Sequence, residues 1–265
     1  DAYSISKDEK YAYACINQIV HWIESNPYPQ GVNYKCGQEI AFRLFAWIIA
    51  CDYFSNFISK DKWLMIRKAI YVSLCRIDLN IDYAAKSVRN NHSISEAVGL
   101  LVGGLLFPEF PESQHFKKKG LEYLCHEVAY QVYHDGTYIQ HSFNYQRLAM
   151  DVLSFAILIM KNKNTEVPNR ILEAHRKLYI CLNSFVQENG YLPNYGSNDG
   201  AYLFPIGNYD YRDYRQSLNF ASAVNQGALL FDSSKNIVEL FNLTYSEKPI
   251  SLAKNVSFEM GGYYI

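Results

Sequence analysis

The sequence has almost no excess of charge of either sign. Its 25 lysines and arginines are balanced by 26 aspartates and glutamates, which leaves a formal net charge of -1. Such a chain creates no overall field that would attract nucleic acid or a membrane surface, so we predict neither as a partner. A preference for an acidic ligand has to come from a local cluster of cations.

Long apolar runs are missing as well. No stretch approaches the roughly 20 apolar residues that a helix needs to cross a bilayer, so no membrane span is predicted. The chain opens at Asp1, with no methionine and no signal sequence, and we expect that a leader has been removed. On that ground we expect a periplasmic or secreted protein, with a cytoplasmic location as the open alternative.

The cysteines do not form the pairs that bind zinc. None belongs to a CxxC motif, and most fall in apolar helical runs: Cys15, Cys36, Cys51, Cys75, Cys125 and Cys181. This usage predicts small core residues and neither a zinc site nor a disulfide framework. Metal-ligand spacing is absent elsewhere too, so we predict no metal and no other cofactor.

What the chain has in abundance is tyrosine, with 23 tyrosines among 265 residues. A tyrosine offers a flat apolar face and a hydroxyl, which suits contact with sugar rings. The alternative is that these side chains fill a helical core with their hydroxyls in water. Since 49% of the residues are hydrophobic and 19% are charged, the chain is expected to be globular.

Helical periodicity covers most of the sequence. The predicted helices span residues 8–24, 36–57, 60–79, 93–105, 112–133, 142–161, 167–187 and 214–230. The helices that begin near 36, 93, 142 and 214 are the more apolar, and the more amphipathic ones alternate with them. Because helices that are apolar all round are buried, this alternation predicts an all-α fold, an incomplete (α/α) toroid of helical hairpins with inner and outer helices. An ordinary α-helical bundle is the alternative.

Two segments are not expected to be helical. Residues 189–213 are rich in Gly, Asn, Pro and Tyr, and so long a connection is expected to have a function. Residues 251–265 have the pattern of a turn that runs into a β-strand. Because a strand is not stable alone, we predict a toroid catalytic domain over 1–250, and over 251–265 a linker and the first strand of a C-terminal β-sandwich that acts in cis.

Two helix starts carry side chains capable of catalysis. Ser93 and Glu96 fit a capping box, which places Asn91 and His92 just ahead of a first turn. At the second start Ser142 is the expected cap, and Tyr145 falls in the first turn. In the toroid both helix N-termini are expected to open onto one rim and to favour a carboxylate. Each of these residues also has a purely structural explanation, as a capping turn, a core histidine or a packed tyrosine.

Several segments together resemble one family. They are Asn91-His92 with Glu96-Ala97-Val98-Gly99-Leu100, then 106–110, Asp135-Gly136 with 142–145, 192–200, and the terminal Gly261-Gly262-Tyr263-Tyr264. The helix start Gly37-Gln38-Glu39 is also similar. In order and spacing they resemble the N-terminal helical domain of the heparinase II/III polysaccharide lyases, over nearly the whole chain.

The resemblance implies a lyase that cleaves an acidic, uronate-containing polysaccharide by β-elimination, such as a glycosaminoglycan, alginate or a capsular polymer. It implies that Asn91 neutralises the uronate carboxylate, that His92 supports proton transfer, and that Tyr145 acts on the leaving oxygen. Because a further family histidine belongs to the β-domain, the isolated chain is expected to be weakly active or inactive. Around these residues we expect substrate contacts from Glu39, Arg43, Asn90, Gln140, Tyr195, Asn198, Asp199, Arg212 and Arg215.

Departures from the family pattern leave the subfamily open. Gln140 and His141 stand where the family usually has a glutamate before the serine, and Gln146 stands where it often has a histidine. A free tyrosine titrates near ~10, so Tyr145 is suited as an acid, and as a base only if a cation lowers its pKa. We expect Arg43 or Arg212, and not Arg147, to be that cation.

Two other functions remain open from the sequence. A toroid glycoside hydrolase would use two opposed carboxyl groups, drawn from Glu39, Asp135 and Asp199. A glycan-binding module without catalysis would use the aromatic loop at 191–215 as a sugar-contacting wall. That loop is equally well explained as a packed Ω-loop whose aromatic rings face inward.

Overall fold

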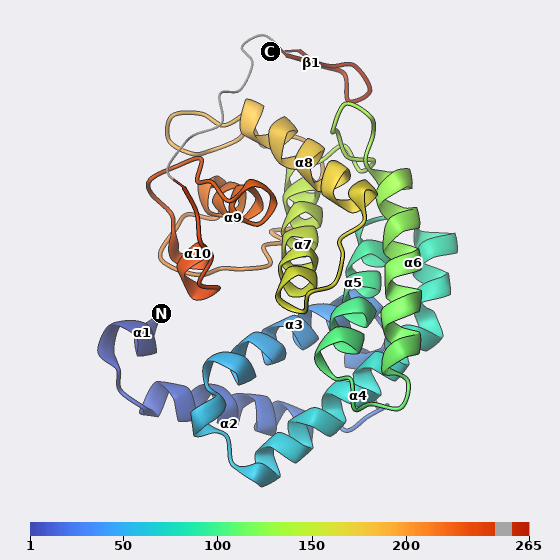
Figure 1. The fold of residues 1–265 in the computed structure, drawn as a ribbon, viewed down its shortest axis with the longest axis vertical. Helices are drawn as coiled ribbons and strands as arrows, with labels where there is room; N and C mark the ends of the chain where they lie inside the picture. Colours follow the sequence, from blue (N-terminus) through green and yellow to red (C-terminus); the bar gives the residue numbers. More distant parts are fainter. Residues whose placement is uncertain (247–255, 265) are drawn as a thin grey trace. The chain divides into compact units, whose positions relative to one another are not determined.

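The structure is a computed structural model that describes residues 1–246 and 256–264. The chain forms two compact units, Asp1–Leu121 and Glu122–Ile265, here called unit 1 and unit 2. Helices make up most of unit 1 and are the main regular structure of unit 2, which confirms the predicted all-α class (Figure 1). Residues 247–255 and 265, with most of the predicted linker, lie outside the described residues, and the domain boundary at 250 stays a prediction.

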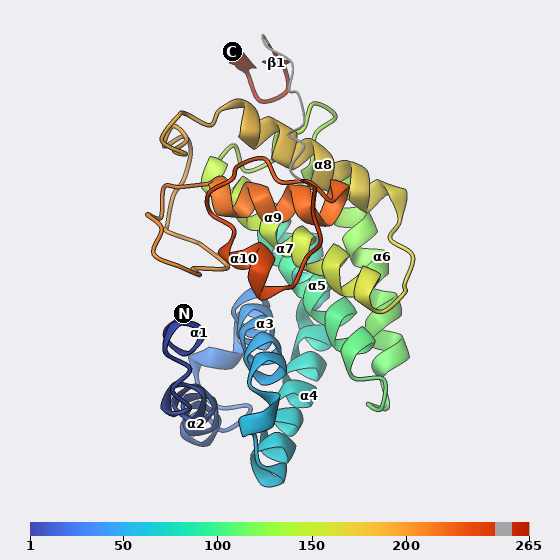
Figure 2. The ribbon, with the colours of Figure 1, turned by 60° about the vertical axis from the view of Figure 1, so that its left-hand side comes forward.

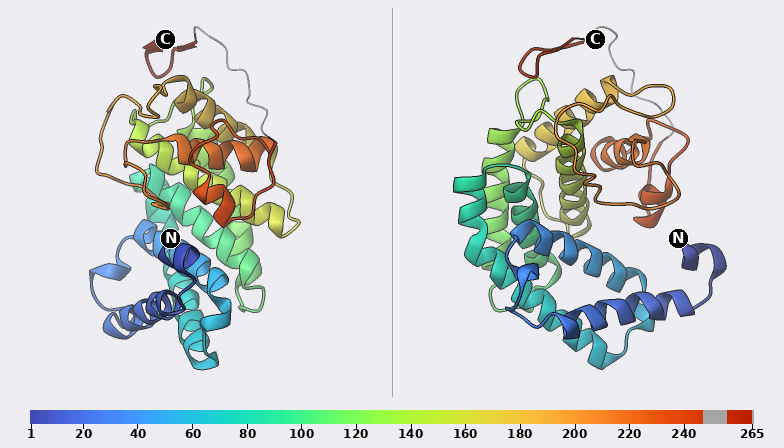
Figure 3. Two further views of the ribbon diagram at one scale, coloured as in Figure 1. Left: turned by 90° about the vertical axis from the view of Figure 1, so that its left-hand side faces the viewer. Right: turned by 180° about the vertical axis from the view of Figure 1, so that it is seen from behind.

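Unit 1 is built around one helix that is buried on every side. Its helices are α1 (Ala2–Ser6), α2 (Lys10–Ser25), α3 (Gly37–Tyr53), α4 (Lys60–Tyr83), α5 (Asn91–Leu106) and the first part of α6 (Ser113–Gln131). Short turns η1 (Val32–Tyr34), η2 (Ser55–Phe57) and η3 (Ala84–Val88) connect them. Nearly all of α5 is buried, whereas α2 and α4 bury one face each. Helix α5 packs against α3 and α4 (Figure 3).

An arginine surrounded by aromatic rings joins α2 to α3. The guanidinium of Arg43 lies 4.2 Å from the ring centre of Trp22, and it donates a 2.9 Å hydrogen bond to the carbonyl of Asn33. Trp22 in turn contacts Trp47 edge to face at 5.4 Å. Cation–π contacts of this kind are stabilising when the cation is partly desolvated. Arg43, predicted to contact substrate, is therefore already engaged within unit 1.

Unit 2 repeats the alternation of buried and covering helices. Its elements are α7 (Phe143–Asn162), α8 (Asn169–Ser184), α9 (Arg215–Gln226), α10 (Asn236–Leu240), β1 (Ser257–Phe258) and β2 (Tyr263–Tyr264). Helices α7 and α9 are buried along most of their length, whereas α8 buries one face against both of them (Figure 2). The apolar helices predicted near 36, 93, 142 and 214 thus begin at Gly37, Asn91, Phe143 and Arg215.

The predicted turn and strand near the end of the chain form a small hairpin. Strands β1 and β2 pair antiparallel, with Phe258 opposite Tyr263. The hairpin is held on the helical part of unit 2 by Asp135, which accepts a 2.7 Å hydrogen bond from the backbone N–H of Met260. Phe258 also lies 5.6 Å from Phe185, ring centre to ring centre.

The sequence did not predict some short elements. Helices α1 and α10 have five residues each, too few for a periodic pattern, and the π turn η3 extends the fourth helix beyond its expected end at 79. Within the described residues no helix combines the length and the apolar character needed to cross a membrane.

Candidate active site

The predicted site residues form two groups, one in each unit. The first group lies at the starts of α3 and α5 in unit 1. The second group lies at the start of α7 and in the long loop at 189–213 of unit 2.

Helix α5 begins earlier than the sequence predicted. Asn90 is its N-cap, with an extended backbone and a side-chain oxygen that accepts a 3.0 Å hydrogen bond from the N–H of His92. Ser93 instead donates its hydroxyl to the carbonyl of Asn90, and Glu96 lies buried one turn further on. The predicted capping box of Ser93 and Glu96 is therefore wrong. Asparagine caps a helix as well as serine does, and here the earlier residue has the cap.

The imidazole of His92 lies next to a thiol from the neighbouring helix. Its Nδ1 is 3.7 Å from the Sγ of Cys36, the residue that precedes α3. Burial lowers the pKa of His92, and the nearby carboxylate of Glu39 opposes that shift. A histidine shifted downward is neutral at pH 7 and is able to accept a proton.

The starts of α3 and α5 are in close contact. Gln38 donates a 3.1 Å hydrogen bond to the hydroxyl of Ser95. At Gly37 a β-carbon would lie 2.3 Å from the carboxyl carbon of Glu96, so only glycine fits there without displacing that side chain. Asn91 is enclosed at this junction and is 2% exposed.

Glu39 occupies the first turn of α3 and is exposed. A carboxylate there is stabilised by the positive end of the helix dipole. Its negative charge would repel a sugar carboxylate, so Glu39 is better suited to accept a hydrogen bond from a sugar hydroxyl.

In unit 2 the predicted start of the second helix is confirmed. Ser142 is the N-cap of α7, and its oxygen accepts a 3.2 Å hydrogen bond from the N–H of Tyr145. The Tyr145 hydroxyl donates a 2.9 Å hydrogen bond to Oδ2 of Asp199. Tyr145 is half-buried and Asp199 is exposed on the loop. Two residues predicted for the site, 54 positions apart, are thus brought into direct contact.

The surroundings of the phenol favour its protonated form. Partial burial and the Asp199 carboxylate both raise the pKa of Tyr145, and Tyr211 adds to the shift. All of these causes act upward, so the prediction that Arg43 or Arg212 lowers this pKa is wrong for the described residues. The phenol keeps its proton at neutral pH and is suited to the role of an acid.

A second group of side chains holds Asp199, and the sequence did not reveal it. Asn144 donates a 3.2 Å hydrogen bond to Oδ1 of Asp199. The Asn144 oxygen accepts hydrogen bonds from Tyr211 at 2.6 Å and from Arg147 at 3.2 Å. Asn144 and Arg147 are three residues apart, a spacing that puts two side chains on one face of a helix. The spacing of Asn144 and Arg147 is therefore the sequence feature that could have indicated their shared role.

Arg147 is buried, although the sequence placed it away from the site. It is 0% exposed, donates to the backbone carbonyls of Tyr211 at 2.6 Å and Ala201 at 3.3 Å, and lies over the rings of Tyr202, Tyr211 and Tyr214 at 4.4 to 4.6 Å. Arg147 therefore fastens the aromatic loop to α7.

The other predicted residues of the loop have mixed surroundings. Asn198 is exposed, donates a 2.8 Å hydrogen bond to Asn194 and accepts one from Tyr211. Tyr195 is 44% exposed and packs edge to face on Tyr263 at 5.1 Å. Gln140 is half-buried in the turn before α7.

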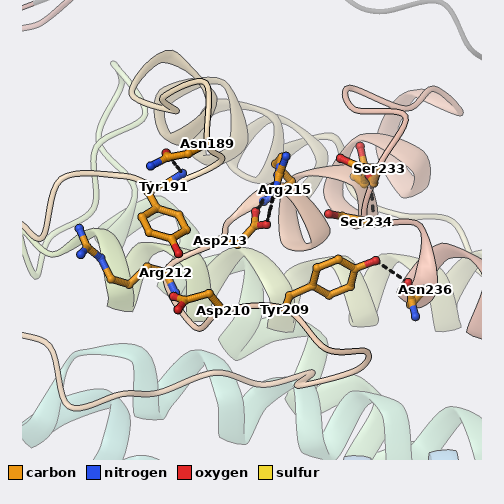
Figure 4. A network of polar contacts seen from close by, with 11 residues as sticks. Asn189, Tyr191, Tyr209, Asp210, Arg212, Asp213, Arg215, Ser233, Ser234 and Asn236 are labelled. Carbon is orange, nitrogen blue, oxygen red and sulfur yellow. Dashed lines mark hydrogen bonds and ion pairs between the residues drawn. The ribbon is translucent and has the colours of Figure 1, made fainter.

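The two arginines predicted to meet an acidic group lie further along the loop (Figure 4). Arg215 forms a two-point ion pair with Asp213, with contacts of 2.6 Å and 3.0 Å. Arg212 is exposed and lies 5.1 Å from the ring centre of Tyr191. Arg212 is therefore the more accessible of the two to an anionic ligand.

The aromatic loop is partly a packed loop and partly an exposed surface. Tyr202 and Tyr214 face inward onto Arg147, and Tyr209 donates a 2.6 Å hydrogen bond to Asn236 (Figure 4). Tyr195 remains the exposed ring of this set. Most of the loop's tyrosines therefore stabilise the loop itself.

Of the three carboxylates considered for a hydrolase, Asp135 and Asp199 are engaged in structural contacts. Asp135 accepts hydrogen bonds from the N–H and hydroxyl of Thr137 and from Met260, and despite partial burial its pKa is lowered by these donors. Asp199 is occupied by Tyr145 and Asn144. Over residues 1–246 and 256–264, no cluster of three or more His, Cys, Asp or Glu side chains is placed to hold a metal ion.

These features place the chain among all-α domains of helical hairpins with polar residues at helix starts. A family model described as Heparinase II/III N-terminus matches residues 1–203. The chain belongs to the heparinase II/III N-terminal family.

Individual relatives agree with this assignment. A heparin-sulfate lyase of Bacteroides thetaiotaomicron is 27% identical over 209 residues, which cover 77% of this chain and 29% of that protein. A heparin-sulfate lyase of Bacteroides stercoris is 24% identical over 199 residues, covering 68% of this chain and 30% of the other. The chain thus spans about 30% of the length of these relatives.

Solved structures show the same fold. A crystal structure of heparinase III has a TM-score of 0.58 and 25% identity, covering 74% of this chain and 30% of that one. The heparan sulfate lyase HepC from Pedobacter heparinus has a TM-score of 0.55 at 22% identity, covering 85% of this chain and 37% of that one. Since the N-terminal domain of heparinase III is a helical toroid, the predicted fold class is confirmed.

Proposed function

We propose that this protein is a polysaccharide lyase that cleaves a uronic-acid polysaccharide by β-elimination, with a glycosaminoglycan as the foremost substrate class. The observation that carries the proposal is the Tyr145 phenol, held at the start of α7 by a 2.9 Å hydrogen bond to Asp199 with its pKa raised. The names of the relatives, heparin-sulfate lyases, support the substrate class.

The reaction requires three functions, and we assign each to a predicted residue. The proton α to the uronate carboxylate leaves, the adjacent C–O bond to the next sugar breaks, and a carbon–carbon double bond forms. Asn91 and the start of α5 stabilise the charge that develops on the carboxylate. Neutral His92 assists removal of the proton, and Tyr145 gives its proton to the leaving oxygen.

Other substrates and functions remain as outcomes of the test. Alginate and capsular uronate polymers have the same acidic α-carbon, so the panel includes them. The hydrolase alternative is weakened by the structural contacts of Asp135 and Asp199. A glycan-binding module without catalysis would retain polymer binding and form no product.

The test uses the full-length protein on a panel of uronate polymers. We expect the ultraviolet absorbance and the mass of an unsaturated product, and Tyr145→Phe should lower kcat by about 10²-fold or more, as expected for the loss of a general acid. Tyr71→Phe is the matched control, because Tyr71 also donates to a carboxylate, that of Glu112 at 2.8 Å, outside the site. Saturated products, or an unchanged kcat in Tyr145→Phe, would overturn the proposal.

A further inference from the structure

The loop that carries Asp199 is attached rigidly to the start of α7. Its backbone carbonyl at Tyr195 accepts a 3.2 Å hydrogen bond from the N–H of Phe143, and the hydroxyl of Ser142 donates to the carbonyl of Ser197 at 2.5 Å. Gly196 has a φ of +77°, and a β-carbon there would lie 2.0 Å from the carbonyl oxygen of His141. The loop and the helix start therefore form one unit, so Asp199 has a fixed position relative to the phenol.

Both oxygens of the Asp199 carboxylate have donors. Oδ2 accepts from Tyr145 at 2.9 Å, while Oδ1 accepts from Asn144 at 3.2 Å and from the N–H of Ala201 at 3.1 Å. Arg147 and Tyr211 fix Asn144 in turn, each with a hydrogen bond to its side-chain oxygen. These three donors hold the carboxylate in a fixed position beside the phenol, so we consider its effect on Tyr145.

We propose that Asp199 is a positioning residue that keeps Tyr145 in the phenol form and restores that form after each turnover. The inference rests on the proposed function and deepens it. When the Tyr145 O–H bond breaks, the leaving sugar oxygen gains the proton and the electron pair stays on the phenolate. The phenolate then faces the Asp199 carboxylate, and repulsion between the two negative charges favours its recovery of a proton from water.

This arrangement has a consequence for the dependence of activity on pH. An acid catalyst is lost as the pH rises through its pKa. A neighbouring negative charge moves that loss to higher pH. Asp199 is exposed, so the protons that restore the phenol reach it from solvent.

The test compares Asp199→Asn with the parent in the full-length protein. The pKa of Tyr145 is measured from the phenolate absorbance that disappears when Tyr145 is replaced by phenylalanine. In Asp199→Asn we expect this pKa to fall by about one unit or more. The alkaline limb of kcat should move to lower pH by the same amount, with KM little changed. Asp199→Glu, which keeps the charge, should restore the alkaline limb, and Asp232→Asn, an exposed carboxylate elsewhere in unit 2, should leave it in place.

The outcomes separate this inference from the proposed function. An unchanged Tyr145 pKa in Asp199→Asn would overturn the inference whether or not product forms. A rise in KM at constant kcat would overturn it as well, because Asp199 would then be a substrate ligand. Absence of unsaturated product in the parent protein would defeat the proposed function instead, and the pKa measurement does not depend on product.

Discussion

Two buried carboxyl groups, one in each unit, connect single residues to the stability of the fold. Glu96 is 3% exposed and Asp151 is 1% exposed, and burial raises the pKa of each to about 7. A carboxyl group whose pKa is raised in the folded chain stabilises it fully below the unfolded pKa, and that contribution is lost as the pH rises through the folded value. The free energy of unfolding therefore falls as the pH rises to about 7, from 4.5 upward for Glu96 and from 3.8 upward for Asp151.

Glu96→Gln should remove the part of the pH dependence of the free energy of unfolding that is due to Glu96 in unit 1. The amide has the same shape and does not ionise, so the free energy of unfolding of the variant should rise relative to the parent between about pH 4.5 and about pH 8, by on the order of 2 kcal/mol. Urea unfolding at the two pH values measures the difference. His175, whose pKa burial lowers to about 3, acts in the opposite direction but equally in both proteins. An equal change in parent and variant would contradict the prediction.

Part of the site could be predicted from single residues and part could not. The cap at Ser142 and the place of Tyr145 follow from short-range preferences, and the structure has both. The cap at Asn90 was misplaced because two cap-forming residues, Asn90 and Ser93, compete within one turn. Asp199 was predicted for the site, but its bond to Tyr145 spans 54 positions and no local pattern encodes such a contact.

At the scale of elements, the loop at 194–200 depends on glycine in two different ways. Gly196 and Gly200 both have positive φ, +77° and +82°. A β-carbon at Gly196 would meet backbone atoms of His141 and Ser142, whereas one at Gly200 would have nothing within 4 Å. Backbone atoms cannot move aside as a flexible side chain does. An alanine at Gly196 would therefore meet both a steric clash and backbone strain, whereas an alanine at Gly200 would meet backbone strain alone.

Gly196→Ala should detach the loop, while Gly200→Ala should be tolerated. Strain at positive φ costs about 1–2 kcal/mol at either position, and the clash at Gly196 adds about 1–3 kcal/mol. The free energy of unfolding, measured with urea, should therefore fall further for Gly196→Ala than for Gly200→Ala. The phenol of Tyr145 should also lose its raised pKa only in Gly196→Ala. Equal losses of stability in the two variants would show that the close approach is unimportant.

The long helices could be predicted from the sequence, and the short ones could not. The periodic pattern placed the starts of α3, α5, α7 and α9 within two residues, because a buried helix is apolar over many turns. The five-residue helices α1 and α10 offer barely more than one turn, so no period is visible. The aromatic loop was predicted as non-helical, but its inward rings depend on Arg147, a contact from another element.

In the molecule as a whole, burial lowers the reactivity of the cysteine thiols. All six cysteines are free, and burial raises the pKa of each thiol, to about 12 for Cys51 and Cys181. The thiolate is the reactive form of cysteine. The native protein should therefore contain no activated thiol among these six.

A chromogenic disulfide reagent tests this expectation on the native protein. All six thiols should react after unfolding in denaturant, while Cys51 and Cys181 should react at least about tenfold more slowly in the native state, since each unit of raised pKa lowers the thiolate fraction about tenfold. A reductant should leave the thermal unfolding midpoint unchanged. A native thiol that reacts as fast as free cysteine would contradict the prediction.

The division of the chain into two compact units was not predicted. The sequence indicated the all-α class and the family, because both are encoded in periodic and local patterns. The boundary between Leu121 and Glu122 falls inside α6, and the helical pattern continues across it without a Gly, Pro or Ser-rich linker. A boundary of that kind depends on which helices pack together, information that periodicity does not carry.

The distribution of the tryptophans allows the unfolding of one unit to be followed by intrinsic fluorescence. All three tryptophans, Trp22, Trp47 and Trp63, belong to unit 1, and the 144 residues of unit 2 contain none. Light that excites indole but not phenol therefore yields fluorescence from unit 1 alone, the unit that contains His92. Because Trp47 is 5% exposed, its emission should shift to longer wavelength when that unit unfolds, so its melting can be followed without any label.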